Sequence, residues 1–352
     1  VARAPDDLAA ILYTSGTTGR SKGAMLTHTN LLSNADVLVR AWRWTSRDCL
    51  LHALPIFHTH GLFVATNISL MAGAAMVFLP AFSVDALAEH LPRCSTLMGV
   101  PTFYTRMLGD PRFTQTSLAH LRLVISGSAP LLADTHASFA AQTGLRILER
   151  YGMTETNMIT SNPYDGPRRA GTVGQPLPDI DIRIDQPDEA GIGGVHVKGP
   201  NVTPGYWRNA EKTAESFTED GWLITGDLGV VDGDGYLSIV GRQKDLVISG
   251  GYNIYPKEVE VAIDALPGVL ESAVYGVPHP DLGEAVCAAV VINAGKAPDP
   301  EGIIAALSGR LARFKIPRTV EIVAGLPRNA MGKVQKNVLR DRAAERAAAQ
   351  KV

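Results

Sequence analysis

Residues 13–23 read YTSGTTGRSKG, and they follow an apolar run at residues 8–12 that predicts a strand. Glycines let the backbone turn tightly and bring its N–H groups close to anionic oxygens. Hydroxyl side chains add further donors, and the lysine adds a mobile positive charge. We therefore predict a loop that binds a polyphosphate, with contacts from Thr14, Ser15, Gly16, Thr17, Thr18, Gly19 and Lys22.

A Walker A loop is one alternative for this stretch, and the spacing excludes it. That loop needs Gly directly before Lys and Ser or Thr directly after it, whereas Lys22 lies between Ser21 and Gly23. A surface turn rich in Gly and Thr is the other alternative. The density of phosphate-binding groups favours the binding loop.

The composition is that of a globular enzyme. Because 352 residues exceed what one hydrophobic core usually holds, we expect two domains. Hydrophobic residues make up 45% and charged residues 19%, which excludes disordered and fibrous classes. The formal net charge of -2 provides no basic field for nucleic acid or anionic lipid. The three cysteines form no CxxC pair, so we expect a reducing, cytoplasmic compartment.

Residues 61–80 contain no charged side chain and are long enough to span a bilayer. They also contain polar side chains and the helix-breaking Gly73. We therefore predict a buried helix to residue 72 and then a core strand over 75–79, in a soluble chain that does not enter a membrane.

Short apolar runs alternate with helix-like segments through the first half of the chain, which predicts an α/β fold with layered parallel sheets. The predicted strands cover residues 9–13, 49–53, 75–79, 97–99 and 123–126, and the predicted helices cover 29–40, 84–91, 102–108 and 132–143. From about residue 179 to 241, short β-type segments separated by Gly and Pro predict a small β subdomain, either an antiparallel sheet or a barrel.

Beyond residue 245 the pattern changes again. Helices are predicted at 256–265, 300–311 and 337–348, and strands at 270–277 and 285–292. This mixture is typical of a compact α+β domain. We predict a first domain over 1–241, a short hinge at 242–245 and a small, mobile C-terminal α+β domain over 246–352.

Two further segments carry groups suited to a nucleotide. Residues 149–156 read ERYGMTET, where Tyr151 offers an aromatic face for a base and Glu155 a hard oxygen ligand for Mg2+. A cap at an ordinary helix start is the alternative for this segment. Asp227 ends a strand-like run, where an acid can accept hydrogen bonds from ribose hydroxyls or can occupy a plain turn. Arg242 adds a forked donor.

Together with a glycine–lysine turn near the end of the chain, these segments resemble the adenylate-forming acyl-CoA synthetases. That superfamily includes luciferases and peptide-synthetase adenylation domains. The matching segments follow the family's order and approximate spacing, and they are residues 13–23, 151–156, 225–227, 241–245 and 327–333. The resemblance implies that a carboxylate attacks the α-phosphate of ATP and releases pyrophosphate, after which the thiol of coenzyme A displaces AMP. Residues 1–241 would then be the remainder of a large adenylation domain.

The resemblance also implies roles in ATP binding. Residues 14–22 would hold the β- and γ-phosphates, Thr154 would contact phosphate, and Glu155 would bind Mg2+. Lys333 would bridge the carboxylate and the ribose or phosphate, because negative charge builds on the α-phosphorus during adenylation. Taken alone, Lys333 would be an exposed lysine after a glycine turn. The other implied ATP-binding residues are Ser128, Ala129, Pro130, Tyr151, Gly152, Met153, Asp227 and Arg242.

The second half-reaction would need a domain movement. The resemblance places a hinge at Lys244, about which the C-terminal domain would rotate and withdraw Lys333. This rotation would present Gly250, Gly251 and Tyr252 to the pantetheine arm of coenzyme A. Two glycines suit a narrow thiol tunnel, because they add no side chains to it.

Two histidines and two arginines bear on the acid that is activated. His58 and His60 would lie on one side of an extended segment, but the sequence supplies no further ligands for a metal. The resemblance implies instead that His60 is a catalytic residue at the acyl and phosphate pocket. A buried guanidinium at Arg106 or Arg150 would need an anion, which a second carboxylate of the substrate would supply.

The flanking sequence makes this expectation more specific. Residues 57–65, 149–158, 161–166 and 245–256 resemble the family members that act on malonate. We therefore predict malonate as the substrate and methylmalonate as a poorer one. The alternatives are a snorkelling surface arginine at position 106 and an ion pair between Arg150 and Glu149 or another internal acid. The predicted substrate-binding residues are His60, Arg106, Ser126 and Arg150.

The position of the phosphate loop departs from the family pattern. It starts at residue 13, whereas in the family it follows a substantial N-terminal subdomain, so we expect a truncated synthetase. The alternatives are a ligase for another short or medium-chain acid, a peptide-synthetase module, and an inactive nucleotide-binding remnant. We expect a monomer or weak homodimer whose partners are malonate, ATP and coenzyme A, with no nucleic acid or membrane.

Overall fold

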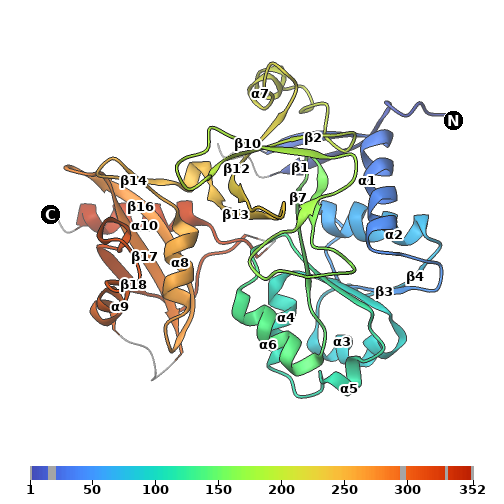
Figure 1. Cartoon of the computed structure of the whole chain (residues 1–352), viewed down its shortest axis with the longest axis horizontal. Coiled ribbons are helices and arrows are strands. Elements are labelled where there is room, and N and C mark those ends of the chain that lie inside the picture. Colours follow the sequence, from blue (N-terminus) through green and yellow to red (C-terminus); the bar gives the residue numbers. More distant parts are fainter. Residues whose placement is uncertain (1, 15–20, 294–298, 330–331, 350–352) are drawn as a thin grey trace. The chain divides into compact units, whose positions relative to one another are not determined.

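The computed structural model describes residues 2–14, 21–293, 299–329 and 332–349. The chain forms two compact units (Figure 1), of which the first comprises Val1–Thr225 and Val230–Ser238 and the second comprises Gly226–Gly229 and Ile239–Val352. Within the described ranges, no helix is long and apolar enough to cross a membrane. The hinge at 242–245 and its mobility stay predictions.

A mixed sheet forms the centre of the first unit. Its strands are β3 (Cys49–His52), β4 (Ala75–Phe78), β5 (Thr96–Gly99), β6 (Leu123–Ser126), β7 (Leu148–Met153), β8 (Asn157–Ser161) and β9 (Gln175–Pro176). Their order is β4-β3-β5-β6-β7-β8-β9, parallel from β4 to β7 and antiparallel from β7 to β9. β5 and β6 are buried along their whole length, as expected for apolar runs covered on both faces. The sheet confirms the predicted α/β fold class.

Helices flank this sheet, and residues with known capping preferences mark their ends. They are α1 (His28–Ala41), α2 (Thr66–Met71), α3 (Val84–His90), α4 (Pro101–Leu108), α5 (Gln115–Leu118) and α6 (Ala133–Thr143). α1 begins after Thr27, whose side chain forms a reciprocal capping box with Asn30. α4 begins with a proline, and α6 ends at Gly144, where φ is 74°. α4 and α6 lie side by side (Figure 1).

The first strands differ from the sequence prediction. The alternating pattern places residues 9–13 among the parallel strands, but β1 (Leu8–Thr14) pairs antiparallel with β2 (Lys22–Thr27) in a separate hairpin. The physical reason is the short connection, because parallel strands need a crossover of a dozen or more residues.

The apolar segment 61–80 also differs from its prediction. A π-helical turn (His60–Ala65) continues into α2, which ends close to the predicted position. β4 then follows, but it lies at the edge of the sheet and not in its core. Phe78 is 50% exposed, because an edge strand is covered by a neighbour on one side only.

The region from residue 181 to 242 forms the predicted small β region. β10 (Asp181–Asp185) pairs antiparallel with β11 (Gly193–Lys198), and the sheet continues through β12 (Leu223–Val231) to β13 (Leu237–Arg242). Helix α7 (Ala210–Glu215) lies between β11 and β12 in the sequence. The division between the two units passes through β12 and β13.

The second unit has a sheet of its own. Its elements are β14 (Val247–Ser249), β15 (Tyr252–Ile254), α8 (Pro256–Asp264), β16 (Val269–His279), β17 (Gly283–Ile292), α9 (Pro300–Leu307), β18 (Thr319–Ile322) and α10 (Lys336–Ala349). The strand order is β15-β14-β17-β16, with β18 parallel to β17. This is the predicted α+β arrangement.

Alternate residues of β17 contribute to two apolar clusters. Val286 and Val290 join the cluster that contains Ile303 of α9, whereas Ala289 joins the cluster that contains Leu339 of α10. Because successive strand residues point to opposite faces, helices cover both faces of this sheet. The second unit therefore has a hydrophobic core of its own.

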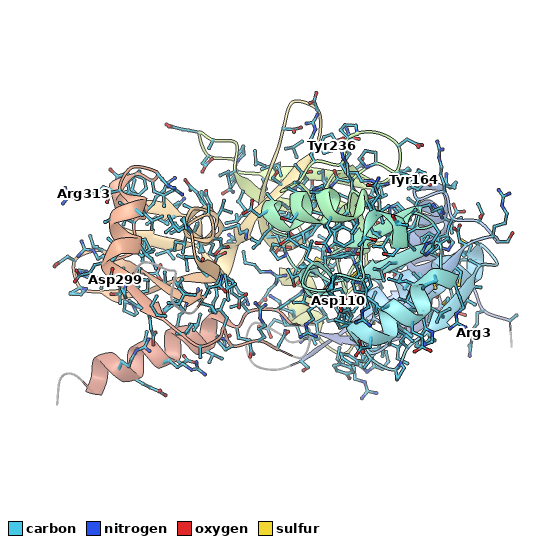
Figure 2. All side chains as sticks on the ribbon, turned by 90° about the horizontal axis from the view of Figure 1, so that it is seen from below. Arg3, Asp110, Tyr164, Tyr236, Asp299 and Arg313 are labelled. Atoms are coloured by element: carbon cyan, nitrogen blue, oxygen red, sulfur yellow. The ribbon has the colours of Figure 1, made fainter. Side chains whose placement is uncertain are left out.

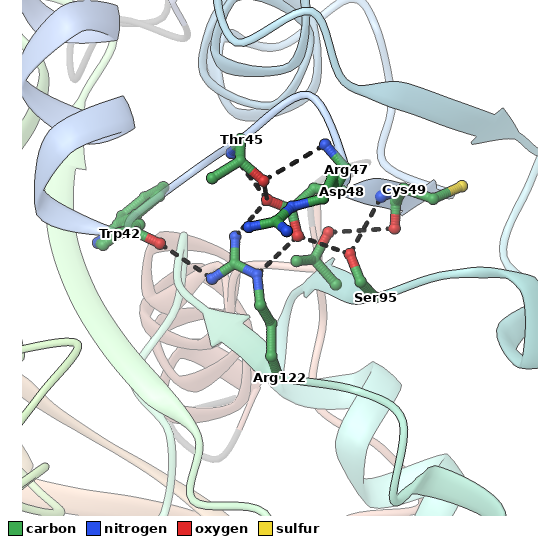
Figure 3. Close-up of polar contacts among 8 residues, drawn as sticks. Trp42, Thr45, Arg47, Asp48, Cys49, Ser95 and Arg122 are labelled. Carbon is green, nitrogen blue, oxygen red and sulfur yellow. Dashed lines mark hydrogen bonds and ion pairs between the residues drawn. The ribbon is translucent and has the colours of Figure 1, made fainter.

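An ion-pair network joins the amino-terminal ends of three strands in the first unit (Figure 3). Arg122, which precedes β6, donates to both carboxylate oxygens of Asp48, at 2.6 and 2.7 Å. Ser95, which precedes β5, donates to the same carboxylate at 2.7 Å. Burial acts to raise the pKa of Asp48, but these hydrogen bonds outweigh it and lower the pKa to about 2. The Arg122 guanidinium also lies 5.4 Å from the ring centroid of Tyr164, a residue that Figure 2 labels.

Candidate active site

The predicted phosphate loop connects β1 to β2. Thr14 ends β1 and lies opposite Lys22, which begins β2. The antiparallel register therefore closes the base of the loop and holds Lys22 at its exit. The other predicted contacts lie outside the described residues and stay predictions; they are Ser15, Gly16, Thr17, Thr18 and Gly19.

Lys22 and Glu155 share Tyr206 as a neighbour. The Tyr206 hydroxyl donates to Glu155 Oε1 at 2.8 Å, and Lys22 Nζ lies 5.6 Å from the centroid of the Tyr206 ring. Burial lowers the pKa of Lys22, Lys212 acts in the same direction, and Glu155 and Glu215 oppose it. The lysine of the phosphate loop and the predicted metal ligand therefore lie in one electrostatic neighbourhood.

Glu155 stands in a turn between two strands. Tyr151, Gly152 and Met153 end β7, and Thr154 and Glu155 lie in the turn that leads to β8. This geometry excludes the helix-start alternative. Glycine is required at position 152, because a Cβ atom there would lie 1.9 Å from a backbone carbonyl oxygen of β8. The turn buries both Thr154 and Glu155.

This turn has the chemistry of a magnesium site. Mg2+ takes hard oxygen ligands and is usually held by one or two carboxylates together with water and substrate phosphates. A buried carboxylate near a phosphate-loop lysine fits that pattern. Among the residues that the structure describes, no three His, Cys, Asp or Glu side chains gather as a metal site of their own.

Arg150 is a buried cation with no anionic partner among the residues that the structure describes. The residue is 4% exposed, and its Nε and Nη2 atoms have no hydrogen-bond partner among those residues. The guanidinium lies over Gly127, where a Cβ atom would approach Arg150 Cζ to 2.3 Å. Burial lowers the pKa of Arg150 to about 9, so the group stays charged at neutral pH. Its desolvation would be offset by a bound anion.

Glu149 does not supply that anion. Successive strand residues point to opposite faces, and Glu149 Oε1 is buried without a hydrogen-bond partner. Burial raises the pKa of Glu149 to about 8, although a backbone hydrogen bond at Gly171 opposes the shift. Because the two side chains leave β7 on opposite faces, they form no ion pair in the described structure, and that alternative is wrong.

His60 lies in the same buried neighbourhood as Arg150. Its Nδ1 atom is 3.2 Å from the Ser128 hydroxyl, and its Nε2 atom is buried without a partner. Burial holds the pKa of His60 well below its usual value, and the charge of Arg150 acts in the same direction. His60 is therefore neutral. Ala129 is half-buried and Pro130 is exposed, just after Ser128.

Ser126 and Arg106 lie differently from what the sequence suggests. Ser126 is level with Glu149 in the pairing of β6 and β7, which places it on the Glu149 side of the sheet. Arg106 is exposed on α4, and its guanidinium lies 5.5 Å from the centroid of the Phe82 ring. The expectation of a buried guanidinium is wrong at Arg106 and confirmed at Arg150.

In the second unit, the predicted ribose-binding acid contacts its predicted neighbour. Arg242 Nε lies 2.8 Å from Asp227 Oδ1, and Asp227 is buried. Asp227 lies within β12, so the plain-turn alternative is wrong. The pair can present a carboxylate whose orientation is fixed by a guanidinium.

Lys333 is exposed in a turn of the second unit. Its N–H donates to Asn329 Oδ1 at 3.0 Å, and a bridge between Arg328 and Val334 closes the turn. Gly332 has a φ of 75°, a conformation that glycine adopts without strain. These hydrogen bonds hold the backbone at Asn329 and Lys333.

The predicted coenzyme A loop and hinge are also in the second unit. Gly250 and Gly251 have φ values of 58° and 82°, which favours glycine at both positions. Tyr252 is exposed and stacks on Phe314 with ring centroids 4.3 Å apart. Lys244 is exposed in a 3-10 turn (Gln243–Asp245).

Sequence reasoning missed Tyr206. It lies in the stretch Pro204-Gly205-Tyr206-Trp207, where two aromatic residues directly follow a Pro-Gly pair. Such a turn is an ordinary surface feature, and only the fold brings it to Glu155. The aromatic pair is the one signal in the sequence that marks this position.

Two family models match the chain. The model for the AMP-binding enzyme matches residues 1–207, and the model for the AMP-binding enzyme C-terminal domain matches residues 258–333. The chain belongs to the AMP-binding enzyme family.

Its relatives include proteins that are named for malonate. The chain is 41% identical to a malonate–CoA ligase from Arabidopsis thaliana, over 95% of this chain and 60% of that protein. It is similar to the crystal structure of ATP-bound MatB from Rhodopseudomonas palustris, with a TM-score of 0.95, 58% identity, and coverage of 97% of this chain and 69% of that one. A malonyl-CoA ligase with methylmalonyl-CoA and AMP bound is 42% identical over 92% of this chain and 73% of that one, with a TM-score of 0.65. The chain spans about three fifths of the length of the curated relatives it matches.

Proposed function

We propose that the chain ligates malonate to coenzyme A through a malonyl-adenylate and releases pyrophosphate and AMP. Family membership and the malonate-acting relatives support this reaction class. One observation carries the choice of acid, namely the buried Arg150 guanidinium, for which the described part of the chain supplies no anion. A monocarboxylate would leave this cation unpaired, whereas a dicarboxylate can pair with it and present its other carboxylate for activation.

In the first half-reaction, the first unit would hold the triphosphate. Lys22 and the loop that begins at Thr14 would bind the β- and γ-phosphates, and Tyr151 would lie against the adenine. Thr154 would contact phosphate. Glu155 fits a site for Mg2+, which when bound supplies positive charge to the phosphates. The orientation of the Glu155 carboxylate is already set by its hydrogen bond from Tyr206.

The acid would bind between a fixed cation and a neutral imidazole. Arg150 would pair with the distal carboxylate of malonate. His60 is neutral because burial depresses its pKa, so it can donate a hydrogen bond to the reacting carboxylate without protonating it. This arrangement leaves the attacking oxygen ionised, as nucleophilic attack on phosphorus requires.

The second unit would supply three further groups. Asp227, held by Arg242, would accept hydrogen bonds from the ribose hydroxyls. Lys333 would meet the negative charge that develops on the α-phosphate. Movement about Lys244 would then present Gly250, Gly251 and Tyr252 to coenzyme A. The predicted cytoplasmic location and the predicted monomer or weak homodimer stay predictions from the sequence.

The test is ATP–pyrophosphate exchange by the purified chain with malonate, methylmalonate or octanoate as the acid. We expect exchange with malonate, weaker exchange with methylmalonate and none with octanoate. Arg150→Met should lower kcat/KM for malonate about 100-fold, since truncating one partner of a buried charge pair costs roughly 2–5 kcal/mol. The control Arg40→Met removes a guanidinium that pairs with Asp36 at 2.7 Å on the surface of α1, and it should exchange like the wild type.

Two results would contradict the proposal. Exchange with octanoate but not with malonate would show that the chain is a ligase for another acid. ATP binding without exchange for any acid would show that it is a nucleotide-binding remnant.

A further inference from the structure

A segment outside the predicted motifs joins the phosphate loop to the predicted metal ligand. On one side, residues 203–207 hydrogen-bond to β2, the strand that leaves the loop: Met25 N–H donates to Gly205 O at 2.9 Å, and Trp207 N–H donates to Gly23 O at 2.8 Å. On the other side, the N–H at residue 203 donates to the carbonyl oxygen of Glu155 at 2.7 Å. The backbone of the 203–207 segment is therefore fixed to both neighbours.

Tyr206 makes the corresponding connection with its side chain. It is 8% exposed. Its hydroxyl donates to Glu155 Oε1 at 2.8 Å, and its ring lies 5.6 Å from Lys22 Nζ. Its own N–H donates to Thr213 Oγ1 at 2.9 Å, which anchors the residue from the side of α7. The tyrosine thus contacts two predicted ATP-site groups through different parts of one rigid side chain.

We propose that Tyr206 is a positioning residue that holds the Glu155 carboxylate for the metal ion and the Lys22 ammonium for the phosphates, an assignment that rests on the function proposed above. The hydroxyl acts on the carboxylate, and the ring face attracts the ammonium. A carboxylate oxygen that accepts a hydrogen bond keeps one orientation, while the group retains lone pairs for a cation.

The electrostatics of the site agree with this division of roles. The Tyr206 hydroxyl donates to the carboxylate at 2.8 Å, and the ring lies on the side of the Lys22 ammonium. Partners that orient a metal-ligating side chain affect metal affinity by about 10- to 100-fold. A ring under a partly buried ammonium contributes a smaller attraction.

The experiment measures ATP binding by titration calorimetry as a function of Mg2+ concentration, with no acid present so that no turnover occurs. Tyr206→Phe removes the hydroxyl and keeps the ring. It should raise the Mg2+ concentration for half-maximal enhancement of ATP binding about 10-fold and leave ATP affinity without metal unchanged. Tyr206→Leu removes both parts, so it should also weaken ATP binding without metal.

Tyr236→Phe is the matched control. Tyr236 (Figure 2) is a buried tyrosine of the same unit, and its hydroxyl donates to the carbonyl oxygen of Pro167 at 3.0 Å. The Tyr236→Phe variant should keep the wild-type Mg2+ midpoint, even if its melting temperature changes.

Two outcomes separate this inference from the function on which it rests. If the wild type shows Mg2+-dependent ATP binding and Tyr206→Phe has the same midpoint as Tyr236→Phe, the positioning role is wrong while the proposed function stands. If the wild type shows no Mg2+-dependent ATP binding, the result contradicts both the positioning role and the proposed function.

Discussion

At the residue scale, Arg150 shows how one side chain can lower stability and provide specificity. Removing a guanidinium from water is unfavourable unless an anion accompanies it. In this chain the described neighbours leave two of its nitrogen atoms without hydrogen bonds. A bound dicarboxylate would complete the site, so substrate binding and stability should be linked at this position.

Arg150→Met should therefore raise the free energy of unfolding in the absence of malonate. A buried ion without a partner costs several kcal/mol of desolvation, and an apolar side chain of similar length avoids this cost. Urea denaturation of the wild type and the variant measures the difference. Malonate should stabilise the wild type and not the variant, and a variant less stable than the wild type without malonate would refute the linkage.

The buried Glu149 carboxyl should make the free energy of unfolding depend on pH. Its pKa is raised from 4.5 to about 8 in the folded chain, mainly by burial. Between these values the folded state binds a proton that the unfolded state has lost, so the free energy of unfolding falls as pH rises. The slope from this group approaches about 1.4 kcal/mol per pH unit.

Glu149→Gln should remove this slope. Denaturation at pH 5 and pH 8 should show that the variant gains stability relative to the wild type as pH rises. An unchanged difference between the two proteins at both pH values would mean that the Glu149 carboxyl ionises normally.

At the scale of elements, the network at the start of β3, β5 and β6 ties neighbouring strands together by charge. Arg122→Met would leave the buried Asp48 carboxylate without its guanidinium partner. Breaking a buried pair from one side costs about 3 kcal/mol or more, so we expect a loss of that size in urea denaturation. Arg40→Met, at an exposed pair within α1, should change stability by less than about 0.5 kcal/mol. Equal effects of the two substitutions would refute a structural role for the network.

Local pattern was sufficient to predict most elements. The central strands β5 and β6 are short apolar runs whose side chains are buried on both faces, so hydrophobicity alone marks them. The helices that flank them carry ordinary caps, such as Thr27 at the start of α1. These features depend on residues close in sequence, which is why they can be read without the fold.

The remaining features depend on partners far away in the sequence. The edge position of β4 and the exposure of Arg106 are properties of the assembled unit. Tyr206 lies 51 residues from Glu155 in sequence, and neither motif indicates the contact. The residues next to Arg150 in the sequence suggest that it is buried, but they do not indicate whether an anion accompanies it.

At the scale of the whole molecule, each unit has a hydrophobic core of its own. The core of the second unit comes from β16, β17 and their helices, and the ion-pair network belongs to the first unit. We therefore expect Arg122→Met to speed amide hydrogen exchange in β5 and β6 and to leave the β16 and β17 amides unchanged. Equal acceleration in both sheets would show instead that the units unfold together.

The most direct measurement of the central claim is product formation by this chain from ATP, Mg2+, malonate and coenzyme A, with products identified by mass spectrometry. The account predicts malonyl-CoA and AMP in equal amounts, and their loss in a Lys333→Ala variant that still binds ATP. Bound ATP without either product from the wild-type chain would contradict it.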